Sequence, residues 1–437
     1  MEQGTGKTFL AFMFMVARFR KGQIRRAVFF CPVSVKSTIA YEARKHLADC
    51  KIYSFDSKTQ EGTIPDAHLY IVGTESLSGF GRAYYAVTPL LTHDCMVVLD
   101  EAHMIANHTQ RTQRLIQATR QTRYRLELTG TPHEEGAKGL FYPMFFLDMR
   151  ILGYQSWYSF AANHLEYSER YPDMVVNSHN TEHLAAKMRP YIYQVTKADC
   201  LDLPDVEERN IWFDMSQQQQ EAYAQAKSDF LLDVDPNDWH PHDLFRLFSA
   251  LQQIVCGHWR LKGKLYELEN PRLDAMMEKV QAIDQDEPVI IWAKYHYDIR
   301  EIVSRLHVGG YSPEDITVFT GEKNEREKDE ALVRFHGGAK FFVGTYTGSM
   351  GLTLNEAAHM IFYSYTFSAR PRLQAEDRNH RIGQDRTTHR YFLACNDSID
   401  ERIMQAIADK TCWAAQMRQQ IRAAKDMASL RQIVAAA

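Results

Sequence analysis

The stretch CMVVLDEAH, residues 95–103, is a continuous apolar run that ends abruptly in two acidic residues, Asp100 and Glu101. An unbroken apolar run of this length is typical of a strand buried on both faces of a parallel sheet. Ligands bind at the carboxyl ends of such strands. Asp100 there can hold Mg²⁺, directly or through water, and Glu101 can polarise an attacking water. The alternative is that the two acids simply begin a helix.

Similar apolar runs follow one another along the chain in two series, separated by amphipathic stretches. The first series contains AVFFCPVSV (27–35), HLYIVGT (68–74) and YRLELTGTP (124–132). The second contains PVIIWAKY (288–295), DITVFTG (315–321), KFFVGT (340–345), HMIFYSY (359–365) and HRYFLAC (389–395). Strands that alternate with helices indicate parallel sheets covered on both faces. We therefore expect an α/β protein with two parallel-sheet lobes. The first covers 1–200 and includes a helical insertion from about residue 133, and the second covers 201–437.

The chain opens with MEQGTGKT, in which Gly4, Thr5, Gly6, Lys7 and Thr8 match the end of a phosphate-binding loop. Glycines let backbone N–H groups converge on phosphate oxygens, and the helix that follows adds its positive end. Lys7 would reach the β- and γ-phosphates of ATP, and the Thr8 hydroxyl would bind Mg²⁺. The full pattern has another glycine where Met1 stands, so a glycine-containing leader before a core helix is the alternative.

Composition limits the class of protein. The 437 residues include 51 Lys and Arg against 55 Asp and Glu, a formal charge of −4, so nucleic-acid binding requires a local basic patch. The seven cysteines are scattered without a CxxC pair, which indicates reduced thiols inside a cell. We see no signal peptide and no apolar run near the ~20 residues that cross a bilayer. We therefore expect a cytoplasmic protein without a membrane partner.

These motifs resemble those of a known family. GTGKT (4–8), DEAH (100–103) and LTGTP (128–132) resemble motifs I, II and III of superfamily-two helicases, and QAEDRNHRIGQ (374–384) closely resembles motif VI of their Swi/Snf-type branch. GTYTGSMGLTLNEA (344–357) resembles motif V, and the segment 197–223 resembles the one that opens the second lobe. The resemblance implies two RecA-like lobes, an ATP hydrolase, and a phage or bacterial member acting in the (host) cytoplasm. It also implies that His103 and Gln374 contact the nucleotide.

Motif VI has a direct physical interpretation. Gln374, Asp377, Arg378 and Arg381 have the spacing of one helix face. Two guanidiniums on one face suit the charge that develops on a γ-phosphate. We expect Arg378 and Arg381 to act from the second lobe on ATP held by Lys7 in the first, so that ATP in the cleft draws the lobes together. A solvated helix of mixed charge is the alternative.

The nucleic-acid contacts are expected at strand ends. CPVSVKS (31–37) resembles motif Ia and offers Ser34 and Lys36, and Thr320 and Thr345 follow strands of the second lobe. Where family members often carry a tryptophan, this chain has Ile39. Phosphate contacts do not read sequence, which suits movement along any double-stranded DNA.

Two other interpretations are not favoured. His240, His242, Cys256 and His258 could suggest zinc, but their spacing matches no standard zinc module. Trp157, Tyr158 and Phe160 could stack on bases, but we expect them to form the core of the helical insertion.

We therefore expect an ATP- and Mg²⁺-dependent translocase on double-stranded DNA. The alternatives are a helicase that separates strands of DNA or RNA, and an inactive DNA-binding remnant. The remnant is considered because the chain begins inside motif I, whereas the resemblance implies a preceding strand and a segment that holds adenine. On that ground we expect a loosened first lobe and weak ATP hydrolysis.

Overall fold

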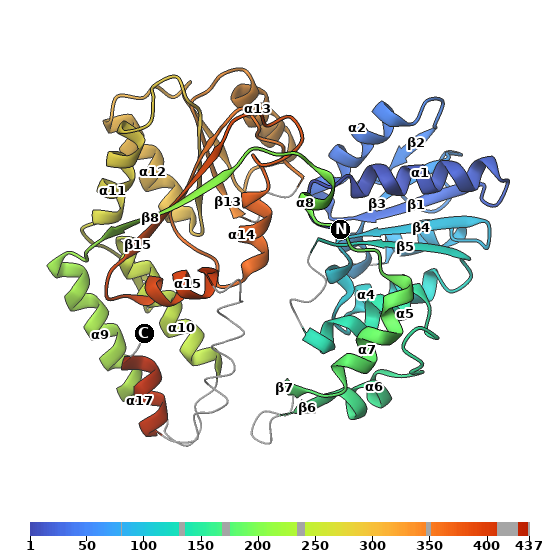
Figure 1. The fold of residues 1–437 in the computed structure, drawn as a ribbon, viewed down its shortest axis with the longest axis horizontal. Coiled ribbons are helices and arrows are strands. Elements are labelled where there is room, and N and C mark those ends of the chain that lie inside the picture. Colours follow the sequence, from blue (N-terminus) through green and yellow to red (C-terminus); the bar gives the residue numbers. More distant parts are fainter. Residues whose placement is uncertain are drawn as a thin grey trace. The chain divides into compact units, whose positions relative to one another are not determined.

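The computed structural model describes residues 1–79, 81–130, 136–167, 175–233, 241–346, 351–408 and 427–435. The chain divides into two compact units, Met1–Asp202 and Leu203–Ala437. Each is described by itself below, with the elements labelled as in Figure 1.

The described part of the first unit is built on a five-stranded parallel sheet with the strand order β2-β3-β1-β4-β5. Its strands are β1 (Arg26–Cys31), β2 (Ile52–Ser54), β3 (Leu69–Gly73), β4 (Cys95–Asp100) and β5 (Tyr124–Leu128). Nearly all residues of β1, β3 and β4 are buried, as expected of apolar strands covered on both faces. Asp100 therefore stands at the carboxyl end of an interior strand, where the sequence predicted it.

Helices cover both faces of this sheet. Figure 1 shows α1 (Lys7–Arg20) and α2 (Lys36–His46) on one face, and α4 (Gln110–Ala118) and α5 (Phe141–Leu147) on the other. The short helix α3 (Arg82–Val87) follows β3. On the α4 side, Val28, Val97 and Leu115 belong to one buried cluster.

The remainder of the first unit forms a small helical subdomain with its own core. Its elements are α5, α6 (Trp157–His164), the antiparallel pair β6 (Leu165–Tyr167) and β7 (Val175–Ser178), α7 (Thr181–Met188) and α8 (Lys197–Cys200). Phe141, Phe160 and Leu184 are buried together at its centre. Aromatic side chains thus hold the insertion together, as predicted.

The described part of the second unit contains a six-stranded parallel sheet with the order β12-β13-β11-β14-β15-β8. Its strands are β8 (Val206–Phe213), β11 (Val289–Ala293), β12 (Ile316–Phe319), β13 (Phe341–Thr345), β14 (His359–Phe362) and β15 (Thr388–Cys395). β9 (His258–Leu261) and β10 (Lys264–Glu267) pair as a separate antiparallel ribbon. The prediction of two parallel-sheet lobes is confirmed in both units.

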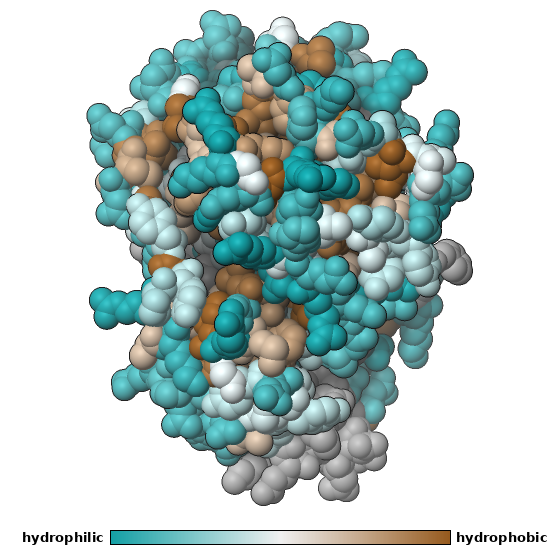
Figure 2. Space-filling model, turned by 90° about the vertical axis from the view of Figure 1, so that its right-hand side faces the viewer, coloured by the Kyte–Doolittle hydropathy of each residue, from teal (hydrophilic) through white to brown (hydrophobic). Residues whose placement is uncertain are grey.

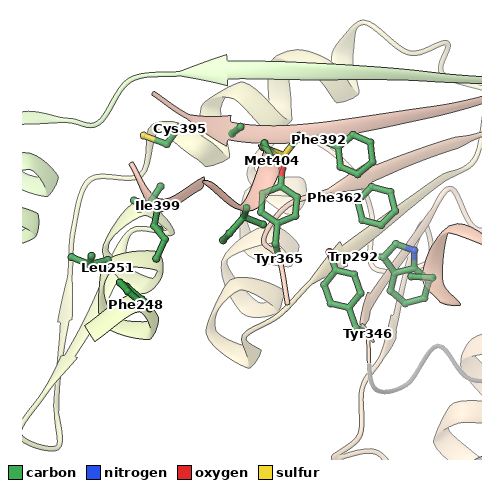
Figure 3. Close-up of a cluster of buried hydrophobic side chains, with 14 of the residues drawn as sticks. Phe248, Leu251, Trp292, Tyr346, Phe362, Tyr365, Phe392, Cys395, Ile399 and Met404 are labelled. Atoms are coloured by element: carbon green, nitrogen blue, oxygen red, sulfur yellow. The ribbon is translucent and has the colours of Figure 1, made fainter. Parts of the chain in front are cut away.

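Eight helices of the described part surround this second sheet and create two cores. They are α9 (Gln217–Asp233), α10 (Pro241–Val255), α11 (Pro271–Gln281), α12 (His296–Val308), α13 (Glu325–His336), α14 (Ala369–Glu376), α15 (Ile399–Ala408) and α17 (Met427–Ala435). Side chains of β11 alternate between the cores: Ile290 and Trp292 join one, and Ile291 joins the other. Figure 3 shows the first core, where Trp292 lies near Tyr346 and Phe362.

A buried ion pair links two elements of the second unit that are distant in sequence. Arg272 of α11 and Asp400 of α15 are both fully buried, and their side chains are hydrogen-bonded. Arg272 also donates to the carbonyl oxygen of Leu393, 3.0 Å away. The contacts of Arg272 with the Asp400 carboxylate and with backbone carbonyl oxygens offset the cost of burying its charge.

Candidate functional site

The loop before α1 has the backbone shape of an anion site. Gly4 and Gly6 adopt φ angles of 79° and 80°, in the left-handed region that glycine enters without strain. α1 begins at Lys7 without a side-chain cap and without an acidic residue in its first turn. A helix start of this kind presents backbone N–H groups and a positive dipole to a negatively charged ligand.

Lys7 and the residues before it are held by backbone carbonyls. The Lys7 ammonium donates to the carbonyl oxygens of Glu2, at 2.8 Å, and Met1, at 3.3 Å. The N–H group of Glu2 donates to the carbonyl oxygen of Val195, and its carboxylate accepts from the N–H group of Lys197 at 2.6 Å. The start of the loop is therefore anchored to the last segment of the first unit, while Thr8 occupies the second position of α1.

Asp100 lies within the electrostatic reach of this lysine. Burial and, to a smaller extent, the neighbouring Glu101 carboxylate raise the pKa of Asp100 to about 7, although the Lys7 charge opposes the rise. A Cβ atom placed on Gly130, two residues after β5, would lie 3.6 Å from the Lys7 ammonium nitrogen. The structure thus brings Lys7 together with the carboxyl ends of β4 and β5, although these segments are far apart in sequence.

Glu101 occupies a strained turn directly after β4. Its φ angle of 55° places a non-glycine residue in the left-handed region, a conformation often found at functional sites. Its N–H group donates to Oδ1 of Asp100 at 3.1 Å, and its Oε2 atom lies 3.2 Å from Nδ1 of His103. This turn brings His103 to the Glu101 carboxylate.

Motif VI differs from the expected geometry. We predicted that Gln374, Asp377, Arg378 and Arg381 share one helix face, but α14 ends at Glu376 and Asp377 is its C-cap. The prediction that these four residues share one helix face is therefore wrong. The Nε atom of Arg378 donates to the carbonyl oxygen of Gln374 at 2.6 Å, one of the last carbonyls of the helix, and so helps to end it.

The two arginines of motif VI differ in burial. Arg378 is only 3% exposed and also donates to the carbonyl oxygen of Leu352 at 3.2 Å. Arg381 is half-buried, and its Nε atom donates to the carbonyl oxygen of Asp377 at 2.7 Å. Gln374 is buried. A role for these residues toward the nucleotide stays a prediction, and Arg381 is the more accessible of the two.

The four residues expected to contact nucleic acid differ in how exposed their side chains are. Ser34 is exposed in η1 (Val33–Val35), directly after β1. Lys36 is half-buried, and its ammonium donates to the carbonyl oxygen of Phe55. Thr320 and Thr345 stand at the ends of β12 and β13 and are 5% and 3% exposed. Of the four, only Ser34 is exposed, and all four assignments stay predictions.

The structure also reveals supporting residues that the sequence did not indicate. Oε2 of Glu75 accepts from the N–H group of Val33 at 3.0 Å, and Arg114 donates to the carbonyl oxygens of Leu77 and Gly79, both at 2.7 Å. These bonds fix the loops that follow β1 and β3. Sequence motifs do not indicate these hydrogen bonds, because the donor and the acceptor of each are distant in sequence.

A second supporting set lies under motif VI. The Glu376 carboxylate is hydrogen-bonded to Arg372 and lies 3.2 Å from the guanidinium of Arg390, which also contacts Glu208 at 2.9 Å. Arg372, Glu376 and Arg390 are all buried. This network ties α14 to β15 and β8 and so holds the motif in place.

Some residues named in the sequence analysis lie in parts of the chain that the structure does not describe. His240 and the side chain of His242 lie outside the described residues, as do Thr131 and Pro132 of LTGTP, residues 347–350 of motif V, and most of the expected surface loop at 233–243. Cys256 and His258 are both buried.

The aromatic residues of the insertion fall into two groups. Phe160 is fully buried and Trp157 packs partly against the same core. Tyr158 is 83% exposed, so its assignment to the core was wrong. Within the described part of the chain, no helix has the length and apolar character needed to cross a membrane.

Comparison with known proteins identifies two family matches. Residues 2–259 match the SNF2-related domain, and residues 272–383 match the helicase conserved C-terminal domain. The first match covers more than half of the chain, and its end lies inside the second unit.

Individual relatives are distant. The mouse (Mus musculus) SWI/SNF-related matrix-associated actin-dependent regulator of chromatin subfamily A member 1 is 25% identical over 337 residues, which cover 71% of this chain and 30% of that protein. The ATP-dependent DNA helicase DDM1 of Arabidopsis thaliana is 24% identical over 351 residues, 72% of this chain and 44% of that protein. The chain therefore spans less than half the length of these relatives.

Among solved structures, the Sulfolobus solfataricus SWI2/SNF2 ATPase core in complex with dsDNA is 22% identical. It has a TM-score of 0.41, with coverage of 98% of this chain and 89% of that one.

Proposed function

The chain belongs to the SNF2-related family, with a helicase C-terminal domain in its second half, and from this premise we propose that it is an ATP-dependent translocase on double-stranded DNA. One observation carries the proposal. The start of α1 is uncapped and preceded by two left-handed glycines, and its Lys7 lies within electrostatic reach of Asp100 at the end of an interior strand. A relative named as an ATP-dependent DNA helicase supports ATP as the nucleotide.

The residues of the first unit fit a nucleoside triphosphate with Mg²⁺. The N–H groups of the loop and the Lys7 ammonium would hold the phosphates, and Thr8 with Asp100 would hold the cation. Mg²⁺ commonly takes one or two carboxylates and completes its shell with phosphate and water, so a small donor set is sufficient. The bound cation would supply charge stabilisation to the phosphoryl group.

Glu101 is the proposed acceptor of the proton from the attacking water. Its carboxylate lies beside His103 on the left-handed turn that follows β4, and the side chain is 16% exposed. A carboxylate that is not committed to the cation can orient and deprotonate water. Arg378 and Arg381 would stabilise the charge that develops on the γ-phosphate, and Gln374 and His103 would contact the nucleotide.

Double-stranded DNA is the proposed track. The proposed contacts to backbone phosphates, which do not read sequence, are Ser34, Lys36, Thr320 and Thr345 at or beyond strand ends, and of these Ser34 is exposed. The relatives are much longer than this chain, so additional activities and partners of those proteins do not transfer to it. A cytoplasmic location is part of the same proposal.

The test is a comparison of phosphate release with blunt duplex DNA, single-stranded DNA and RNA, at several salt concentrations. We expect duplex DNA of any sequence to stimulate turnover most. DNA affinity should fall with salt by a slope of about −0.9 in log K for each phosphate contacted. A requirement for single strands would favour a strand-separating helicase. The absence of hydrolysis with every nucleic acid would favour a DNA-binding remnant.

A further inference from the structure

The first unit contains a cavity of about 800 Å³ between α4, α5 and the start of α6, and none of the residues proposed above to bind nucleotide or DNA lines it. Its walls include Phe141, Tyr142, Phe145 and Trp157. Cavities of roughly 300–1,000 Å³ with apolar walls and a few polar groups are the usual binding sites of proteins. This cavity is large enough for several side chains of a partner.

One wall of the cavity is a column of stacked rings. The rings of His108 and Tyr142 are nearly parallel, with centroids 5.5 Å apart, and those of Tyr142 and Trp157 are nearly parallel at 5.6 Å. Phe141 meets Trp157 edge to face at 5.5 Å. The rings are thus engaged with one another, which gives a rigid wall and few open ring faces for a nucleobase.

Large apolar side chains are exposed beside this wall. Tyr158 is 83% exposed and Met149 is 42% exposed, and both line the cavity. Figure 2 shows that apolar side chains on one face of the molecule lie in patches separated by polar side chains. Aromatic residues, Met and Arg are the types enriched where proteins bind one another.

The charges that line the cavity are unbalanced. Three guanidiniums, those of Arg120, Arg125 and Arg150, face one carboxylate, that of Asp148. Arg150 is paired with Asp148, with its Nε atom 2.9 Å from Oδ1, and Arg125 donates to the carbonyl oxygen of Phe146 at 2.8 Å. Arg120 is exposed, and no acidic side chain of the described residues forms an ion pair with it. The cavity therefore favours a negatively charged ligand.

We propose that this cavity binds a segment of a partner protein in which aromatic or leucine side chains are flanked by carboxylates. The apolar side chains would enter between the ring column and Met149, and a carboxylate would pair with Arg120. Single-stranded nucleic acid is disfavoured, because the rings are already stacked and most of the guanidinium donors are already used. The inference does not rest on the proposed motor function.

The test uses Trp157, which is the only tryptophan among residues 1–202. Peptides are selected against the full chain from a random dodecapeptide display library, and the most enriched are titrated into protein labelled with 5-fluorotryptophan. We expect enriched peptides to combine aromatic or leucine residues with Asp or Glu, and to shift the Trp157 fluorine resonance. That resonance is assigned by its loss in Trp157→Phe.

Two rim variants and a control complete the design. Arg120→Glu and Met149→Glu should each weaken peptide binding at least about tenfold, because a rim charge and an apolar contact are lost. Arg44→Glu, an exposed arginine of α2 on the other side of the sheet, should leave the affinity unchanged. The proposal is overturned if no peptide is enriched, or if the enriched peptides bind all variants equally. It is also overturned if an oligonucleotide shifts the Trp157 resonance in a manner lost in Arg120→Glu.

Discussion

The Oε2 atom of Glu101 lies 3.2 Å from Nδ1 of His103, on the turn that immediately follows β4. The backbone N–H group of Glu101 donates to Oδ1 of Asp100, so one short turn carries a carboxylate at the end of the strand and another beside His103. The two acids of one dipeptide can therefore serve different ligands, the cation and the attacking water.

The first prediction concerns Glu101→Gln. The amide is a poor proton acceptor, whereas Asp100 remains available to the cation, so ATP should stay bound while turnover falls by about 10²–10⁴. Phosphate release and titration with a fluorescent ATP analogue measure the two effects separately. Turnover within a few-fold of the unchanged protein would mean that Glu101 is not the base.

Lys7→Ala should weaken ATP binding by about 10–100-fold, the loss expected for a charge-assisted hydrogen bond to phosphate. Lys21→Ala is the matched control, because Lys21 is an exposed lysine at the other end of α1. Nucleotide titration compares the two. Equal ATP affinities of the two variants would show that the phosphates do not bind at the start of α1.

The two arginines of motif VI differ in burial, so their alanine variants should differ in stability as well as in turnover. Arg381→Ala should keep ATP bound and lose about 10³-fold or more in turnover, as for an arginine finger. Arg378→Ala should lose turnover and also stability, because each carbonyl left without its donor costs about 1–3 kcal/mol. Thermal melting beside phosphate release distinguishes them. Loss of nucleotide binding in Arg381→Ala would assign that arginine a different role.

Glu127 of β5 should make the first unit sensitive to pH. Burial raises the pKa of Glu127 to about 8, and its Oε1 atom has no hydrogen-bond partner in the described part of the chain. Since the pKa is raised on folding, the folded state binds the extra proton. Stability should therefore fall as the pH rises from the unfolded pKa near 4.5 to about 8, and level off above that.

Glu127→Gln should remove this dependence. Since one pKa unit corresponds to about 1.4 kcal/mol, the variant should be more stable than the unchanged protein by at least about 1 kcal/mol at high pH and by little at low pH. Urea unfolding across the pH range measures the difference. Glu61→Gln, an exposed carboxylate of the same unit, is the control. A constant difference at every pH would contradict the assignment to Glu127.

The sequence allowed the parallel sheets and the ends of β4 and β13 to be predicted, because strands buried on both faces must be apolar throughout. The left-handed backbone of Gly4 and Gly6 was likewise predictable, because a tight phosphate-binding loop needs residues with positive φ angles. These features are local, so a short stretch of sequence specifies them.

Other features depend on partners that are distant in sequence or on a helix end that periodicity does not mark. The helix of motif VI ends at Glu376 because the Arg378 side chain bonds to its last turn, and no glycine or proline announces this. The pair Arg272 and Asp400 is formed across the second unit. Lys36, expected at a phosphate, is instead hydrogen-bonded to the Phe55 carbonyl, and its proposed role has still to be tested.

The central claim is that ATP hydrolysis moves this protein along intact double-stranded DNA. The most direct measurement is displacement of a triplex-forming third strand from a duplex, followed by native gel electrophoresis. We expect release of the third strand with ATP while the duplex strands stay paired, and no release by Glu101→Gln. Separation of the duplex strands, or release that does not depend on ATP hydrolysis, would contradict the account.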